Sequence, residues 1–291
     1  MSRLLAISDI HLDHAANRQA LAALPPHPED HLLVPGDVGD DLDRLEEAWE
    51  ILTARFASVT WTPGNHELWD RRGTGLRGVA RYEALVAACR RAGVRTPADP
   101  PWRFDGAGGP ALVVPLFLLY DYSLRPPEIP RDGVQGWAAA AGIRPTDERF
   151  LGTDPFPDIS AWNAALVAAA ERRLDAAARS GLPLVVTSHF PWRHDLNRIE
   201  RVHDGRLARF LPWCGTRETE DWHRRWPIRV VVHGHLHMRA TDWRDGVRFE
   251  EVAVGYPRHW RREAGFAGYL REVLPGPASP DVPPTEPTWH R

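Results

Sequence analysis

Short apolar runs alternate with longer amphipathic stretches along the chain. The length of the apolar runs and their β-branched residues favour strands over helices. These runs lie at 3–8, 31–36, 58–64, 111–120, 183–188 and 228–234. Helical spacing of apolar residues fills intervals between them, at 43–56, 81–93 and 160–181. Strands that alternate with helices predict an α/β fold with much parallel pairing.

Three further segments refine this outline. Residues 249–257 predict one more strand, which follows a turn at Asp245-Gly246. Residues 123–159 are rich in proline, glycine and charge, and so long a connection predicts a cap or a substrate loop. Residues 273–291 predict a proline-rich C-terminal tail.

Side chains that can bind metals directly follow five of the predicted strands. They are Asp9, His11, Asp37, Asn65, His66, His189, His235 and His237. Open α/β sheets bind ligands at the edge where the carboxyl ends of the strands meet. Alternate residues of an extended segment point the same way, so Asp9 and His11 can bind one ion. His235 and His237 can likewise reach into one site, which predicts a single centre at this edge.

The residue types indicate a centre of transition-metal ions. Mixed imidazole and carboxylate ligation suits manganese, iron, zinc or cobalt better than magnesium or calcium. The absence of thiolate ligands excludes a structural zinc site of the cysteine type. With only two ligating carboxylates, a pair of divalent ions would keep excess positive charge, which a phosphate substrate would neutralise.

Five short motifs carry a resemblance to a known family. The stretches SDIHLD, PGDVGD, PGNHE, TSHF and HGHLH resemble the five motifs of the calcineurin-like metallophosphoesterases, in the family's order. The resemblance implies a four-layer sandwich of the α/β class, in which two mixed β-sheets pack together between helices. It implies one domain over 1–272, because Asp9 and His237 must meet at one site.

The resemblance also implies a role for each motif residue. Asp9, His11 and His237 would bind one metal ion, and Asn65, His189 and His235 the other, with Asp37 bridging them. The ions would be manganese, iron, zinc, cobalt or nickel, with manganese or iron favoured, and a bridging hydroxide would attack the phosphate. His66 would protonate the leaving oxygen. Asp40 would either orient His66 or be a solvated turn residue, and His233 would pack near the centre without binding metal.

The motifs narrow the family without selecting a substrate. No arginine directly follows Asp40 in GDVGDDLDR, which counts against a protein phosphatase. Ser188 precedes His189, where many diesterase relatives carry a second histidine, which weakens the case for a cyclic-nucleotide diesterase. The favoured function is hydrolysis of the phosphate ester of a small phosphorylated metabolite, with a monoester preferred. The alternatives are a phosphodiesterase for a cyclic nucleotide or other diester, a nuclease, and a non-catalytic scaffold with this fold.

Loops near the predicted centre supply candidate substrate-binding residues. Arginine can bind a charged group through two hydrogen bonds, and tryptophan can stack on a flat ring. Arg193 is the first candidate because it lies four residues after His189. The other candidates are Asp121, Tyr122, Arg125, Trp192, Trp213, Cys214 and Thr216. Packing within the protein is the alternative for each of them.

Composition excludes several other classes of protein. The net charge of −3 argues against a broad nucleic-acid-binding surface. All 36 basic residues are arginine, so chemistry that needs a lysine is excluded. Two cysteines provide no disulfide framework, and no apolar run approaches the ~20 residues that span a membrane. A cytoplasmic protein is therefore expected, while the oligomeric state stays open.

Overall fold

The computed structural model describes residues 1–199 and 205–277, whose strands form two mixed sheets. The smaller sheet has the order β10-β1-β2-β3, in which only the pairing of β10 with β1 is antiparallel. Its strands are β1 (Leu4–Ala6), β2 (His27–Pro35), β3 (Phe56–Thr62) and β10 (Arg271–Leu274). The larger sheet has the order β4-β5-β6-β7-β9-β8, with antiparallel pairs at its two edges. Its strands are β4 (Trp102–Phe104), β5 (Ala111–Pro115), β6 (Leu184–Thr187), β7 (Ile228–His233), β8 (Ala240–Arg244) and β9 (Val247–Glu251).

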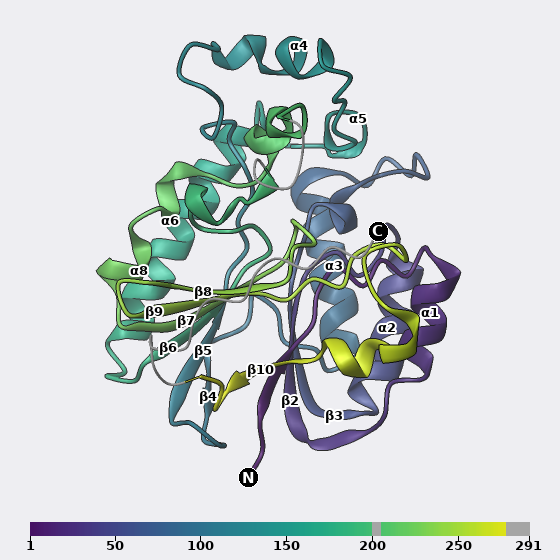
Figure 1. Cartoon of the computed structure of the whole chain (residues 1–291), viewed down its shortest axis with the longest axis vertical. Coiled ribbons are helices and arrows are strands. Elements are labelled where there is room, and N and C mark those ends of the chain that lie inside the picture. Colours follow the sequence, from purple (N-terminus) through teal and green to yellow (C-terminus); the bar gives the residue numbers. More distant parts are fainter. Residues whose placement is uncertain (200–204, 278–291) are drawn as a thin grey trace.

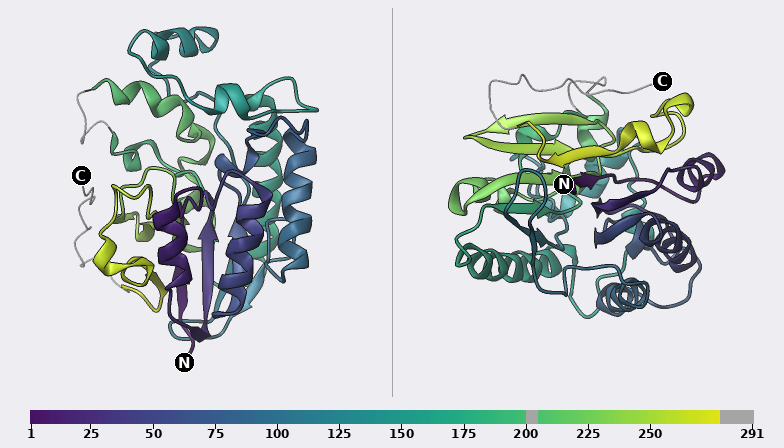
Figure 2. Two further views of the ribbon diagram at one scale, coloured as in Figure 1. Left: turned by 90° about the vertical axis from the view of Figure 1, so that its right-hand side faces the viewer. Right: turned by 90° about the horizontal axis from the view of Figure 1, so that it is seen from below.

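Helices cover the outer face of each sheet, as Figures 1 and 2 show. The smaller sheet is covered by α1 (Ala15–Ala22), α2 (Leu42–Thr53) and α3 (Gly78–Arg91). The larger sheet is covered by the long α6 (Ile159–Ala178) and the short α8 (Trp222–Arg225). No helix in the described part of the chain is both long and apolar enough to cross a membrane.

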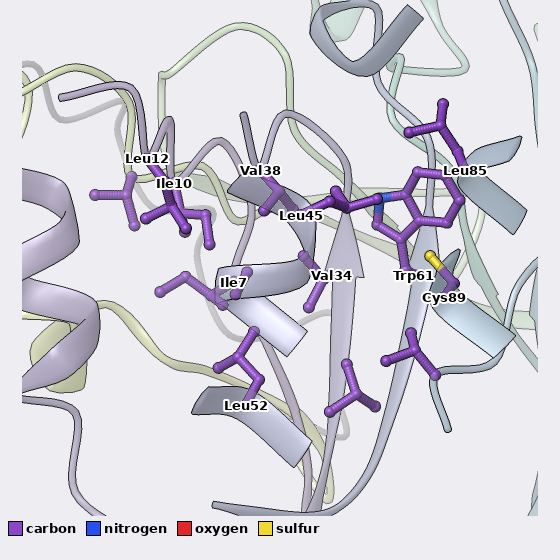
Figure 3. Close-up of a cluster of buried hydrophobic side chains, with 14 of the residues drawn as sticks. Ile7, Ile10, Leu12, Val34, Val38, Leu45, Leu52, Trp61, Leu85 and Cys89 are labelled. Atoms are coloured by element: carbon purple, nitrogen blue, oxygen red, sulfur yellow. The ribbon is translucent and has the colours of Figure 1, made fainter. Parts of the chain in front are cut away.

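Alternating side chains explain why the sheets stack in this way. In β1, Leu4 and Ala6 face the larger sheet, whereas Leu5 between them faces the helices. The layer between the two sheets also takes Val113, Val185, Val230 and Val232 from the larger one. Figure 3 shows part of the layer beneath the helices, where Val34 and Trp61 lie among Leu45, Leu52 and Leu85. Each fully buried side chain of this kind stabilises the fold by about 1.5–3 kcal/mol.

The predicted four-layer α/β sandwich is confirmed, and the differences concern the ends of some elements and the presence of others. The strand predicted at 111–120 ends at Pro115, and the one predicted at 249–257 ends at Glu251. Beyond both points the chain leaves the sheet, and residues after β9 line the site described below. Elements that were not predicted from the sequence include α1, β4, β8 and β10.

The two unusual segments differ in how much of them the structure describes. Strand β10 includes residues 273 and 274, so the predicted tail begins inside a strand that pairs with β1. Residues 278–291 of that tail lie outside the described residues.

Residues 123–159, called the cap segment here, contain the short helices α4 (Val134–Ala139) and α5 (Asp147–Phe150). Figure 1 shows both helices at the end of the molecule opposite the N-terminus. A central carboxylate ties the segment to its surroundings, because Glu148 Oε1 accepts hydrogen bonds from Tyr122 Oη at 2.6 Å and Trp213 Nε1 at 2.7 Å. Gln135 donates to the other oxygen of Glu148.

Candidate metal centre

The loops after β1, β2, β3, β6 and β7 meet at one edge of the two sheets. They bring six of the seven predicted ligands, together with His66, into three groups whose ligand atoms lie within 4.8 Å of one another. Asp9, His11 and His237 form one group; Asp37, His189 and His235 form another; His11, Asp37 and His66 lie between them. All of these side chains come from loops that directly follow a strand, as predicted. His233 belongs to none of these groups of described residues, and its ring is buried.

Two glycines permit the close approach of these loops. A Cβ atom at Gly64 would lie 2.1 Å from Asp37 Oδ1, and one at Gly234 would lie 2.1 Å from Asp9 Oδ2. Any side chain at either position would therefore displace a candidate ligand. Both glycines stand directly before another candidate ligand, Asn65 and His235 respectively, so adjacent motifs depend on one another sterically.

The backbone at the centre is strained. Seven described residues other than glycine have a positive φ, and five of them are candidate ligands. These five are Asp9 at 52°, His11 at 37°, Asp37 at 53°, His235 at 75° and His237 at 54°. Such conformations cost on the order of 1–3 kcal/mol each and persist where the surrounding structure fixes them, most often at functional sites. The fold thus gives up stability to aim these side chains at one point.

The group around Asp9 is compact and buried. His11 Nε2 lies 3.0 Å from His237 Nε2, which lies 3.1 Å from Asp9 Oδ1. The other ring nitrogen of His237 lies 3.0 Å from Nδ1 of His259. His259 therefore occupies the outer nitrogen and leaves Nε2 of His237 directed into the group.

In the group around His189, too, one ring nitrogen has a partner outside the group and the other points into the group. Nδ1–H of His189 donates to the carbonyl of Pro35 at 2.9 Å, which directs Nε2 into the group. Burial lowers the pKa of His189, but Asp37 outweighs this effect and raises it to about 10, so an ion bound at Nε2 would replace a proton there. This Nε2 lies 3.2 Å from both Asn65 Oδ1 and His235 Nδ1, and 3.4 Å from Asp37 Oδ2. The buried Nε2 of His235 has no hydrogen-bond partner among the described residues.

These donors fit a pair of metal ions. An ion bound about 2.0–2.2 Å from each donor holds neighbouring donors roughly 3 Å apart, as they are here. Burial and the neighbouring imidazoles lower the pKa of His11 and His235 well below the usual range, so both rings are neutral, as ligands must be. Burial alone would raise the pKa of Asp37, but His189 and His66 bring it well below its ordinary value. Nitrogen and oxygen donors without sulfur suit manganese, iron, zinc or cobalt.

His66 and Asp40 form the predicted contact. Nδ1 of His66 lies 2.8 Å from Asp40 Oδ1, and Asp40 is only 7% exposed. Asp40 is therefore not the solvated turn residue that the alternative interpretation required. Burial lowers the pKa of His66, but the carboxylates of Asp37 and Asp40 outweigh this effect and raise it. The ring also packs on Trp69, with 3.6 Å between the ring centroids.

Glu67, the last residue of PGNHE, has a structural role that was not predicted from the sequence. Its buried carboxylate accepts hydrogen bonds from the backbone N–H groups of Asp37 at 3.1 Å, Val38 at 2.7 Å and Gly64 at 2.9 Å. These donors belong to the loops after β2 and β3. Glu67 therefore connects the loop of Asp37 to the loop of Asn65.

Glu67→Gln is expected to lower the free energy of unfolding by about 2 kcal/mol. Glutamine keeps one acceptor oxygen, but its amide NH₂ then faces a backbone N–H that has lost its partner. Urea denaturation of the metal-free protein, followed by tryptophan fluorescence, measures the effect. Glu46→Gln on the exposed side of α2 is the matched control and should cost less than about 0.5 kcal/mol. A loss at Glu67 no larger than that of the control would contradict this role.

Two cavities open on the centre. The larger, of about 420 Å³, lies between the candidate ligands and the cap segment. Its walls include Ile143 and Arg144 from the cap segment and Phe210 opposite them. The smaller, of about 330 Å³, is lined mainly by polar residues, including Asp13 and Arg71. His66, Tyr256 and Arg258 line both cavities, so His66 lies where they meet.

The eight predicted substrate-binding residues are not found in these two cavities. None of them is among the described residues that line either cavity, although Tyr122 lines a separate one of about 570 Å³. Trp192 and Cys214 are buried in the core. Arg193 pairs with Asp195 at 2.9 Å.

The remaining candidates also have partners within the protein. Asp121 accepts a hydrogen bond from Thr216 at 2.7 Å, and Arg125 donates to the carbonyl of Ile129 at 2.8 Å. Tyr122 and Trp213 both donate to Glu148, as described above. These residues hold the base of the cap segment in place, so their polar groups are already satisfied away from the centre.

Other residues line the centre and were not predicted. Tyr256, Arg258 and His259 follow β9 and reach the site from the same edge as the other loops. The sequence contained a signal for these three residues, because polar and aromatic residues directly follow the apolar strand β9. Asp147 and Arg144 lie in the cap segment, where no sequence pattern marks them.

Comparisons with known proteins match most of the chain. The sequence model of the family described as calcineurin-like phosphoesterase matches residues 2–239. The chain is 43% identical over 280 residues to the acyl-carrier-protein phosphodiesterase PptH of Mycobacterium tuberculosis (strain ATCC 25618 / H37Rv), covering 94% of this chain and 84% of that protein. The crystal structure of phosphopantetheinyl hydrolase (PptH) from Mycobacterium tuberculosis matches with a TM-score of 0.87 and 41% identity, covering 96% of this chain and 98% of that one.

Proposed function

The chain belongs to the calcineurin-like phosphoesterase family. We propose that it is a metal-dependent phosphodiesterase that releases the phosphopantetheinyl group from acyl carrier protein. The observation that carries this proposal is the likeness to PptH, which covers 94% of this chain in sequence and 96% of it in structure. The phosphodiesterase alternative from the sequence therefore replaces the favoured hydrolysis of a small-metabolite monoester. The proposed substrate is therefore a group attached to a protein and not a small metabolite.

The ligand groups support binding of two ions. Asp9, His11 and His237 would hold one ion, Asn65, His189 and His235 would hold the other, and Asp37 would be shared between them. Two such ions supply positive charge to a phosphate group and lower the pKa of water. Manganese or iron is the favoured identity.

The protein's own residues supply binding and proton transfer. Arg258, like His66, lines both cavities, and its guanidinium suits a phosphate oxygen. Nδ1–H of His66 donates to Asp40, which leaves Nε2 to carry a proton to the departing oxygen of the carrier protein. The bond from phosphorus to that oxygen breaks, water supplies the replacing oxygen, and phosphopantetheine leaves with the phosphate.

The larger cavity suits the phosphopantetheinyl arm. Its volume of about 420 Å³ falls within the range of small-molecule pockets. Ile143 and Phe210 offer apolar walls for the carbon chain, and Arg144 lies on the same wall as Ile143. The smaller, more polar cavity remains for the carrier-protein side of the ester.

The test is hydrolysis of holo-acyl carrier protein by enzyme loaded with manganese or iron. Mass spectrometry should show the carrier protein without its phosphopantetheinyl group, together with free phosphopantetheine. Bis(p-nitrophenyl) phosphate should be hydrolysed faster than p-nitrophenyl phosphate. An enzyme that cleaves the monoester and leaves holo-acyl carrier protein intact would return the assignment to a phosphomonoesterase. Cleavage of DNA or RNA in parallel assays would favour a nuclease.

A further inference from the structure

We propose that Asp147, on the first turn of α5, is a positioning residue through which the cap segment orients Asn65 and Trp69. The inference rests on the proposed two-metal function and names a residue outside all five sequence motifs. Asp147 is 4% exposed and lines both the 420 Å³ cavity at the centre and the separate 570 Å³ cavity beneath the cap segment.

One carboxylate oxygen holds both partners. Asp147 Oδ1 accepts hydrogen bonds from Asn65 Nδ2 at 2.8 Å and from Trp69 Nε1 at 2.6 Å. An asparagine amide offers an oxygen on one side and a nitrogen with two protons on the other. Because Asp147 takes the nitrogen, the oxygen of Asn65 must point the opposite way. It points at Nε2 of His189, 3.2 Å distant, which is the direction a metal ligand needs.

The second hydrogen bond acts on His66 indirectly. Trp69 lies against His66, with 3.6 Å between ring centroids, and Arg71 lies 4.7 Å from the centroid of the same indole. The hydrogen bond that Nε1–H donates to Asp147 fixes the indole of Trp69 in its own plane, so the surface on which His66 packs is fixed as well. Asp147 therefore sets the environment of a candidate ligand and of the candidate acid at once.

The backbone strengthens this connection. Trp69 and Leu151 form an antiparallel bridge, and the N–H of Asp70 donates to the carbonyl of Phe150 at 3.0 Å. Figure 1 shows α5 beside the loop that follows β3, in agreement with these contacts. The cap segment is thus docked on the loop that carries Asn65 and His66, and Asp147 lies at that contact.

The buried carboxyl group of Asp147 depends on neutral hydrogen-bond partners. It forms no ion pair with any residue in the described parts of the chain, although its side chain is buried. Burying an unpaired carboxylate costs several kcal/mol unless hydrogen bonds offset the loss of hydration. Asn65, Trp69 and the hydroxyl of Tyr120 are neutral partners that offset this cost, so the carboxylate stays buried only while these partners keep their positions.

The experiment compares Asp147→Ala, Asp147→Asn and the control Asp132→Asn, which alters an exposed carboxylate of the cap segment. Manganese is titrated into the chelator-treated protein by calorimetry, and melting temperature and turnover of bis(p-nitrophenyl) phosphate are measured alongside. Asp147→Ala should weaken one of the two ions by about 10–100-fold and leave the other unchanged, because only one bears the Asn65 ligand. Asp147→Asn keeps an acceptor oxygen and should restore most of that affinity, and the control should match the wild type.

A lower melting temperature with wild-type affinity for both ions in Asp147→Ala would overturn the positioning role. Equal weakening of both ions would overturn it too, because Asn65 belongs to one ion. Failure of the wild type to cleave holo-acyl carrier protein, with the ion pattern as expected, would remove the proposed substrate and leave this inference standing. Failure of the wild type to bind any ion would overturn both.

Discussion

Asp37→Asn is expected to reduce bound metal from about two ions per chain to less than one and to lower turnover on the order of 10³-fold or more, about 4 kcal/mol. Asp37 belongs to two of the three ligand groups, and its Oδ2 lies 3.4 Å from His189 Nε2. Only Asp9 and Asp37 bring negative charge to the proposed ions, so a neutral amide removes half of it. Elemental analysis after metal loading and dialysis measures the loss.

Single-ligand variants provide the comparison. His237→Ala should weaken the ion assigned to Asp9 and His11, and His235→Ala the ion assigned to Asn65 and His189, each leaving the other in place. His233→Asn is the matched control, since His233 lies on β7 but outside the ligand groups, and it should keep both ions. Two tightly held ions in Asp37→Asn would show that Asp37 does not bridge them.

The candidate ligands could be predicted from the sequence because each depends on a local rule. A ligand-type residue directly after a buried strand must lie at the carboxyl edge, and parallel strands bring these edges together. The contact of Asp40 with His66 followed from the resemblance, and the structure contains it at 2.8 Å. The residues that hold the ligands follow no such rule. Glu67 could be seen only once the loops after β2 and β3 were adjacent.

The substrate-binding residues could not be predicted for a related reason. Whether an arginine or tryptophan is available to a ligand depends on its partners, which lie elsewhere in the chain. Arg193 follows a ligand in sequence, yet Asp195 and the backbone of Glu220 occupy its guanidinium. Arg144 lies in a segment with no pattern, and it reaches the larger cavity because the cap segment folds over the centre.

The central strands of the sheets could be predicted from the sequence, whereas the edge strands could not. Central strands such as β6 and β7 are buried on both faces and therefore appear as continuous apolar runs. Edge strands β4, β8 and β10 have sequences such as WRF, ATDWR and REVL, in which polar residues hide the pattern. Strand β10 is also only 4 residues long and pairs with β1 from the other end of the chain. No local signal can indicate that partner.

His66→Ala is expected to keep both ions and lower the turnover of holo-acyl carrier protein by about 10²–10⁴-fold. The reason is loss of the proton that Nε2 delivers to a poor leaving group, the alkoxide of the carrier protein. The loss should be much smaller for bis(p-nitrophenyl) phosphate, because p-nitrophenolate leaves without protonation. Asp40→Asn should show the same dependence on the leaving group with a smaller loss, since the imidazole remains but its orientation is less fixed.

The comparison of the two substrates separates proton transfer from other roles of His66. A side chain that only bound the phosphate would affect both substrates equally, so equal losses would contradict the role of general acid. His194→Ala replaces a histidine in the loop after β6 that lines neither cavity, and it should retain wild-type turnover of both substrates. Metal analysis of each variant is required in the same experiment, because His66 lies within one of the ligand groups. A His66→Ala protein that loses an ion would place this imidazole among the ligands and would transfer the proton-donor role to another residue at the junction of the cavities.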